Sequence, residues 1–130
     1  MSLNDPLANV LSAIKNAEQR GQREVLTKNN STLIRRVLDI MKANDYIADY
    51  EVIPDSRGGS LRIILKGSIN DVGVIKPRYQ IRHKSFERFE KRFLPARGFG
   101  LLIVSTNKGL MTHMQAREQN IGGTLISYVY

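Results

Sequence analysis

The hydrophobic residues of the first half of the chain recur with two periods, and each period predicts a different kind of element. Intervals of three and four residues predict amphipathic helices over 6–20 and 31–44. Asp5 followed by Pro6 is typical of a helix start, and Ser31 is a suitable N-cap for the second helix. The predicted buried stripes are Leu7, Val10, Leu11, Ile14 and Ala17, then Leu33, Ile34, Val37, Leu38 and Met41.

Shorter runs beside these helices predict strands. Residues 23–27 suit one short strand and 46–53 a second. Residues 61–65 suit a third, in which Leu61, Ile63 and Leu65 alternate with Arg62 and Ile64. Residues 54–60 contain proline and glycine, which predicts the turn of a hairpin between the last two strands. The first half therefore predicts the order helix, strand, helix, strand, strand.

The second half predicts mainly strands with short helices. We expect strands over 78–81, 99–104 and 124–130, and helices over 84–93 and 112–119. Three phenylalanines of the first of these helices fall on one helical face. That regular spacing favours core packing over stacking on nucleic-acid bases.

Together these elements predict an α+β protein of two small α/β subdomains. The glycine, serine and proline of residues 68–77 indicate a connecting segment. The N-terminal subdomain then spans 1–67, and the C-terminal subdomain, mainly β with short helices, spans 78–130.

Composition and charge narrow the expected partners. The 130 residues include no cysteine, which excludes disulfides and thiolate metal sites. The formal net charge is +8, and it is uneven: residues 66–130 carry 11 Lys and Arg against 4 Asp and Glu, whereas residues 1–65 carry 9 against 8. A polyanion is therefore the expected partner of the second half, which contains the basic C-terminal subdomain. With no apolar run of about 20 residues and no secretory signal, we expect a cytoplasmic protein without a membrane partner.

Groups for catalysis are poorly supplied, and no metal or other cofactor is expected. His83 and His113 lack carboxylates at metal-ligand spacing, so both are interpreted as surface or packing side chains. Ser105 lacks the glycine pattern of a nucleophile elbow. A small enzyme acting on a phosphate ligand, with Lys108 and the helix that begins at Thr112, is disfavoured because it has no general base.

Residues 105–109 supply groups that suit nucleic-acid recognition. They read Ser-Thr-Asn-Lys-Gly and directly follow an apolar run. Hydroxyls and an amide can contact base edges and sugars, and the lysine can contact a phosphate. Gly109, Gly122 and Gly123 would let the backbone approach a ligand closely. The same residue types are common in an ordinary strand-to-helix turn, so composition alone leaves both interpretations open.

Two sets of residues together resemble the signatures of a known family. The C-terminal set is Val-Ser-Thr-Asn-Lys-Gly-Leu-Met-Thr over 104–112, Ala116-Arg117, Gly122-Gly123 and Tyr-Val-Tyr over 128–130. The N-terminal set is Asp-Pro-Leu-Ala over 5–8 and Lys-Asn-Ala over 15–17. Both resemble small-subunit ribosomal protein eight, and residues 84–97 look like its archaeal and eukaryotic members.

The resemblance implies a two-domain α+β protein that is a structural constituent of the small ribosomal subunit and not an enzyme. Such a protein binds directly to the central domain of small-subunit rRNA and helps its assembly. Neighbouring ribosomal proteins are further implied partners, and the free protein is expected to be monomeric. An RNA-binding translational regulator that acts on mRNA is the alternative.

The resemblance also implies an RNA-binding surface. Its centre is Ser105 and Thr106, followed by Asn107 where the family commonly has serine. The remaining expected RNA-binding residues are Lys108, Gly109, Gly122 and Gly123 around this loop, and Asp5, Lys15, Asn16 and Ser31 on the N-terminal side. From the charge pattern we add Arg88 and Arg92 as phosphate contacts.

Overall fold

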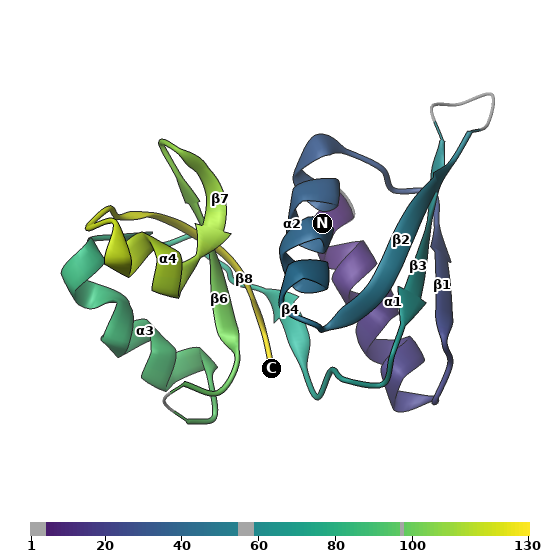
Figure 1. Ribbon diagram of the computed structural model, residues 1–130, viewed down its shortest axis with the longest axis horizontal. Coiled ribbons are helices and arrows are strands. Elements are labelled where there is room, and N and C mark those ends of the chain that lie inside the picture. Colours follow the sequence, from purple (N-terminus) through teal and green to yellow (C-terminus); the bar gives the residue numbers. More distant parts are fainter. Residues whose placement is uncertain (1–4, 55–58, 97) are drawn as a thin grey trace. The chain divides into compact units, whose positions relative to one another are not determined.

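The computed structural model of the chain describes residues 5–54, 59–96 and 98–130. Most of the turn predicted over 54–60 therefore lies outside the described residues, as does Arg97 in the basic second half. The chain divides into two compact units, Met1–Val72 and Gly73–Tyr130. It contains two antiparallel sheets and helices, which confirms the predicted α+β class with two subdomains (Figure 1).

The first unit has the predicted order of elements, and both predicted caps are present. Asp5 Oδ1 accepts a hydrogen bond from the backbone N–H of Ala8 at 3.1 Å, and Ser31 Oγ accepts one from the N–H of Ile34 at 3.2 Å. Each cap satisfies an amide that the first turn of its helix leaves without a partner. The elements are α1 (Pro6–Gln19), β1 (Glu24–Thr27), α2 (Thr32–Ala43), β2 (Ile47–Ile53) and β3 (Ser60–Leu65).

The sheet of the first unit has the strand order β1-β3-β2, with β3 antiparallel to both neighbours. Leu61, Ile63 and Leu65 of β3 are buried, and the residues between them are partly exposed. In Figure 1, α1 and α2 lie together against one side of this sheet. The predicted helical stripes are buried as expected except Leu33, which is partly exposed. The alternate side chains of β3 and the apolar stripes of the two helices therefore form one core.

The second unit contains a five-stranded antiparallel sheet with the order β4-β8-β6-β7, and β5 also pairs with β8. The predicted connecting segment, residues 68–77, contains β4, which the sequence did not predict. The elements are β4 (Val72–Val74), β5 (Gln80–Ile81), the short 3-10 helix η2 (His83–Ser85), α3 (Phe86–Phe93), β6 (Leu101–Thr106), β7 (Gly109–Thr112), α4 (His113–Glu118) and β8 (Gly123–Val129).

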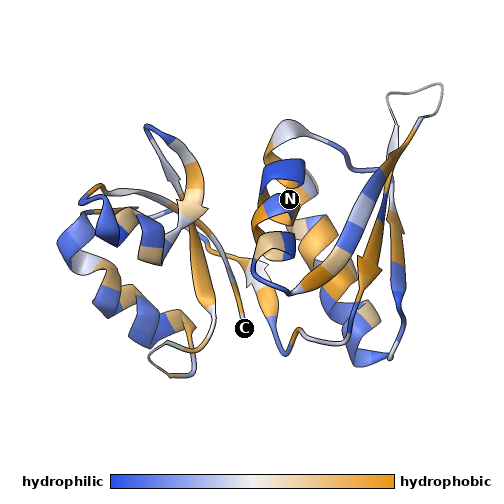
Figure 2. Cartoon of the chain, viewed as in Figure 1, coloured by the Kyte–Doolittle hydropathy of each residue, from blue (hydrophilic) through white to orange (hydrophobic). Residues whose placement is uncertain are grey.

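The core of the second unit lies between its sheet and α3. Phe86 and Phe89 are buried in one cluster with Leu102, Val104 and Leu125, which confirms the predicted core role of these two rings. Phe93, the third phenylalanine of the stripe, is partly buried and packs against this cluster. Figure 2 shows β6 in hydrophobic colours and α3 and α4 largely in hydrophilic ones. These short helices therefore shield an apolar sheet face with narrow apolar stripes of their own.

One segment of the second unit differs from the prediction. The strand expected over 99–104 runs instead from Leu101 to Thr106, and β7 follows after a two-residue turn. Residues 105–109 are thus the end of a β-hairpin and not a strand-to-helix turn. The helix predicted to open at Thr112 begins at His113 with the expected capping box between Thr112 and Gln115.

Candidate nucleic-acid interface

The expected RNA-binding centre lies at the tip of the β6–β7 hairpin. Thr106 pairs with Gly109 across the turn, and Asn107 and Lys108 are the exposed residues between them. Gly109 has a φ of 106°, a conformation that residues with a side chain rarely adopt. The glycine therefore shapes a tight turn that projects an amide and an ammonium group into solvent.

Thr106 uses its hydroxyl to hold this turn. Thr106 Oγ1 donates a hydrogen bond to the carbonyl oxygen of Gly109 at 2.8 Å and accepts one from the N–H of Lys108 at 3.1 Å. A hydroxyl has one proton and two lone pairs, so only acceptor capacity is left for a ligand. The Ser105 hydroxyl, which is partly buried, makes no hydrogen bond within the described ranges. Ser105 can therefore both donate and accept, whereas Thr106 can only accept.

The glycine pair lies beside this hairpin because β8 runs between β5 and β6. A β-carbon on Gly123 would overlap the carbonyl oxygen of Ser105, and one on Gly122 would overlap that of Ile81. These glycines therefore allow neighbouring strands of the protein to approach each other closely, whereas the sequence suggested an approach to a ligand. This strand packing brings the pair next to Ser105, as the expected surface requires.

A shallow groove of about 510 Å³ extends from the glycine pair. Gln80, Ile81, Arg82, His83 and Lys84 line it together with Gly122 and Gly123. The Nε2 of Gln80 donates a hydrogen bond to Thr124 Oγ1 at 2.9 Å, across the β5–β8 pairing. The sequence indicated residues 80–84 only as part of the basic second half, because their place beside 122–123 depends on strand pairing.

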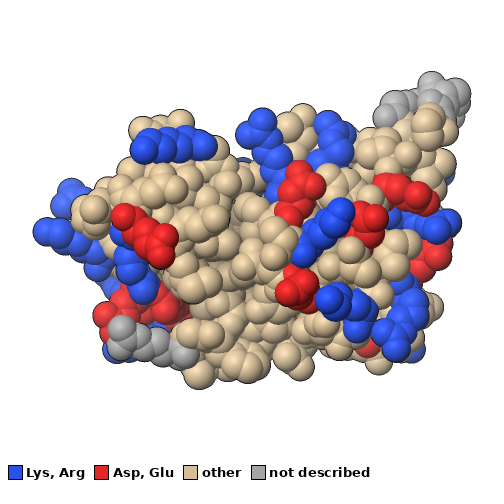
Figure 3. Space-filling model, viewed as in Figure 1, with Lys and Arg blue, Asp and Glu red and all other residues tan. Residues whose placement is uncertain are grey.

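Positive charge surrounds the hairpin and the groove. Arg82 and Lys84 on the groove wall are exposed, as is Lys108 at the turn. Figure 3 shows basic side chains at the hairpin tip and near the start of α3, and acidic side chains elsewhere on the second unit. The geometry therefore combines neutral hydrogen-bonding groups with flanking cations, which is the division that nucleic-acid recognition uses.

Arg88 and Arg92 lie on α3, where aromatic rings hold them. The guanidinium carbon of Arg92 is 5.0 Å from the ring centre of Tyr79 and 5.3 Å from that of Phe93, and that of Arg88 is 5.8 Å from the ring centre of Phe89. Both arginines are exposed. They form a basic face of α3. Neither arginine lines the groove or belongs to the β6–β7 hairpin.

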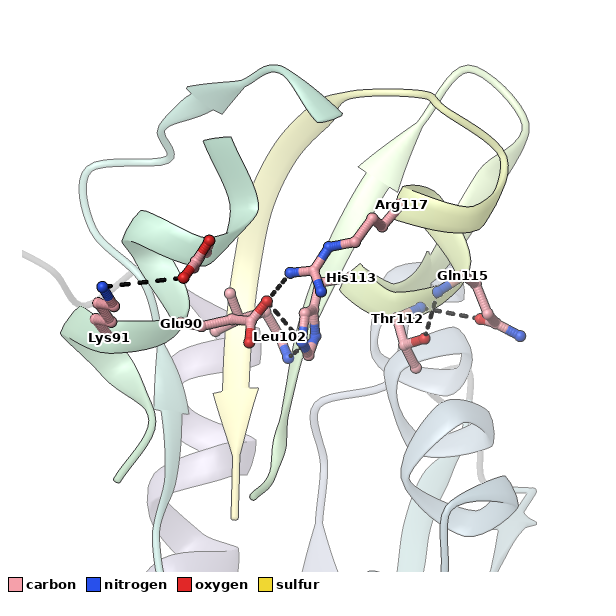
Figure 4. A network of polar contacts seen from close by, with 8 residues as sticks. Glu90, Lys91, Leu102, Thr112, His113, Gln115 and Arg117 are labelled. Atoms are coloured by element: carbon pink, nitrogen blue, oxygen red, sulfur yellow. Dashed lines mark hydrogen bonds and ion pairs between the residues drawn. The ribbon is translucent and has the colours of Figure 1, made fainter. Parts of the chain in front are cut away.

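His113 belongs to a buried polar network and not to this surface (Figure 4). Its Nδ1 accepts a hydrogen bond from the N–H of Leu102 at 3.0 Å, and its Nε2 lies 3.5 Å from Glu90 Oε1. Glu90 also forms an ion pair with Arg117. Burial lowers the pKa of His113, which favours the neutral ring. The network joins α3, α4 and β6, so the prediction of a packing histidine is confirmed for His113.

The four N-terminal candidates lie in the first unit, and three have structural partners there. Asp5 and Ser31 cap helices, and Lys15 Nζ is 3.0 Å from Asp71 Oδ1. Asn16 is exposed on α1. These residues belong to the first unit, whereas the hairpin residues belong to the second.

The described residues contain no group of three His, Asp or Glu side chains that could hold a metal ion. Within the same ranges, no helix is long and apolar enough to cross a lipid bilayer.

A family model described as Ribosomal protein S8 matches residues 5–130. The match includes the hairpin, the glycine pair, α3 and all four N-terminal candidates. It therefore extends the similarity beyond the two terminal signatures to the whole segment between them.

Proposed function

Because the chain belongs to the ribosomal protein S8 family, we propose that it binds the central domain of small-subunit rRNA directly and helps that domain to assemble. Membership of this family makes the chain a ribosomal protein that binds rRNA beside other ribosomal proteins. The family is one of structural ribosomal proteins and not of enzymes. Binding to the central domain in particular, and the role in its assembly, are what we propose.

The β6–β7 hairpin with its glycine backing carries the proposal. Ser105 offers a hydroxyl with its donor and acceptor capacity intact, and Thr106 offers an acceptor fixed by two hydrogen bonds. The fixed Thr106 acceptor loses little freedom on binding, which favours contacts to particular bases or 2′-hydroxyls. We propose that Ser105 and Thr106 read RNA, with Asn107 adding an amide at the turn.

The bound RNA should be a helix with a local irregularity. A regular A-form helix has a deep, narrow major groove that side chains cannot read, and sequence-specific recognition uses bulges, loops or splayed bases. The two-residue turn of the β6–β7 hairpin is narrow enough to enter an RNA groove that such an irregularity widens. Arg82, Lys84 and Lys108 then hold the flanking phosphates without selecting a sequence.

Nuclease footprinting of the full chain on total small-subunit rRNA tests this proposal. We expect protection of one irregular helix within the central domain, and loss of that protection in the variant with both Ser105→Ala and Thr106→Ala. Diffuse protection along the RNA, or one protected site in another domain, would contradict it. A direct role in assembly further requires that the central domain fold more slowly without the protein.

A further inference from the structure

Aromatic rings form a connected row on the α3 side of the second unit's sheet. Ring centres of Phe93 and Tyr128 are 6.0 Å apart, those of Tyr128 and Tyr130 are 6.2 Å apart, and those of Tyr130 and Phe99 are 6.3 Å apart. Phe99 is 49% exposed, and the other three rings are partly exposed. We call these four residues, with Tyr79 and Arg92, the aromatic row. The Phe99 ring is tilted by 55° to the Tyr130 ring, and it is the ring of the four with the most surface to offer a partner.

Arg92 extends the row to Tyr79. Its guanidinium group lies over both the Tyr79 and Phe93 rings, at 5.0 and 5.3 Å, and the arginine itself is exposed. A guanidinium group held against two rings keeps its planar donor fork free to face outward. The aromatic row thus presents a fixed, planar, charged group between its rings.

The acidic residues of α3 are engaged elsewhere. Glu87 lies 3.9 Å from Lys91, and Glu90 is buried against Arg117 and His113. Neither Arg88 nor Arg92 makes an ion pair with any residue that the structure describes. Two exposed arginines beside the rings therefore keep their positive charge unneutralised.

We propose that the aromatic row binds unpaired nucleotides of RNA, with bases stacked on the rings and on the Arg92 plane and with phosphates held by Arg88. This inference rests on the proposed function, since it assigns a second contact to an RNA-binding protein. A simple phosphate site would not need the rings. Arginine beside aromatic rings also occurs at protein–protein interfaces, so an acidic peptide is the competing ligand in the test. Interleaved rings and cations are the combination that proteins use for single-stranded nucleic acid.

The aromatic row is distinct from the hairpin site. On β6, Leu102 pairs with Tyr128 of the row, whereas Ser105 pairs with Thr124. Three residues of a strand span about 10 Å, and residues three apart point to opposite faces of the sheet. Binding at the row can therefore be tested independently of binding at Ser105 and Thr106.

Fluorescence anisotropy with two probes tests the proposal: a labelled ten-nucleotide oligouridine and an abasic ribose-phosphate oligomer of the same length. The full chain should bind oligouridine at least about fivefold more tightly than the abasic oligomer, because stacking adds to phosphate contacts. Arg92→Lys keeps the positive charge but loses the planar guanidinium group, and Phe99→Leu removes the most exposed ring. Each should reduce that preference, whereas Lys91→Gln, which removes a cation paired with Glu87, should retain it.

Three outcomes would overturn the proposal: equal binding of both probes, an unchanged preference in Arg92→Lys and Phe99→Leu, or an Arg92-dependent acidic peptide site that excludes oligouridine. The last would identify a protein-docking surface. The double variant Ser105→Ala with Thr106→Ala should lose the rRNA footprint but keep the preference for oligouridine. Failure of this inference is thereby distinguished from failure of the proposed function.

Discussion

The backbone of Gly123 on β8 lies so close to Ser105 on β6 that a β-carbon at position 123 would overlap the Ser105 carbonyl oxygen. Ser105 is also the residue whose hydroxyl is proposed to read RNA. Strand packing and recognition therefore meet at one position, and a change at Gly123 acts on both.

Gly123→Ala should destabilise the protein and weaken specific RNA binding. The added methyl group must push β8 from β6, and overpacking of this kind costs about 1–3 kcal/mol in the free energy of unfolding. Urea unfolding measures this cost, and filter binding to the protected rRNA fragment measures recognition. Gly21→Ala is the matched control, because Gly21 has a positive φ but no atom within 4 Å of an added β-carbon. Equal effects of both variants on RNA binding would contradict the role of the Gly123 contact.

Ser105→Ala should weaken binding to the rRNA site without lowering stability. Its hydroxyl makes no hydrogen bond in the described part of the protein, so only a ligand contact is lost. A lost hydrogen bond of this kind corresponds to about 1–2 kcal/mol of binding free energy. Filter binding and urea unfolding of the same variant separate the two effects. Unchanged affinity in a stable variant would remove Ser105 from the interface.

Thr106→Val should lower both stability and RNA affinity, because its hydroxyl holds the hairpin turn. Thr106→Ser keeps the hydroxyl and should preserve both properties. The measurements are again unfolding by urea and binding to the protected fragment. If Thr106→Val bound RNA normally while being destabilised, the hydroxyl would be a turn-forming group alone.

His113 should make stability depend on pH. Burial lowers its pKa in the folded protein, so the unfolded chain binds more protons once the pH falls below the ordinary histidine value of about 6.5. The stabilisation from the neutral ring is complete above that pH and is lost as the pH falls toward the lowered pKa. The free energy of unfolding between pH 7.5 and 5.5 should therefore decrease less in His113→Gln than in the wild type.

His83→Gln is the control for that experiment, since His83 is only partly buried and lies outside the Glu90 network. Equal slopes for His83→Gln and His113→Gln would show that His113 is not the titrating group.

Arg82→Gln combined with Lys84→Gln should reduce the salt dependence of rRNA binding with little change in selectivity. Both side chains line the groove beside the glycine pair. Each lost phosphate contact lowers the slope of log affinity against log salt by about 0.7–0.9. Binding measured from 50 to 300 mM salt gives this slope. Lys91→Gln, which removes one positive charge outside the groove, is the control. An unchanged slope would place the groove outside the RNA footprint.

The sequence by itself determined most elements, both helix caps of the first unit and the aromatic stripe of α3. These features depend on contacts within a few residues, such as Asp5 with Ala8 or the helical spacing of Phe86 and Phe89. Local periodicity and cap chemistry record such contacts directly. The predicted surface at residues 105–109 also came from a local motif together with a family resemblance.

Only the tertiary structure decided how that motif is used. β4 and β7 have three and four residues, too few for a periodic pattern, and they exist because β8 and β6 pair with them. Pairing of β5 with β8 puts residues 80–84 beside Gly122 and Gly123, and the β6–β7 hairpin commits the Thr106 hydroxyl to its turn. Pairing between strands distant in sequence depends on the packing of the whole unit, so no local pattern in the chain could have specified it.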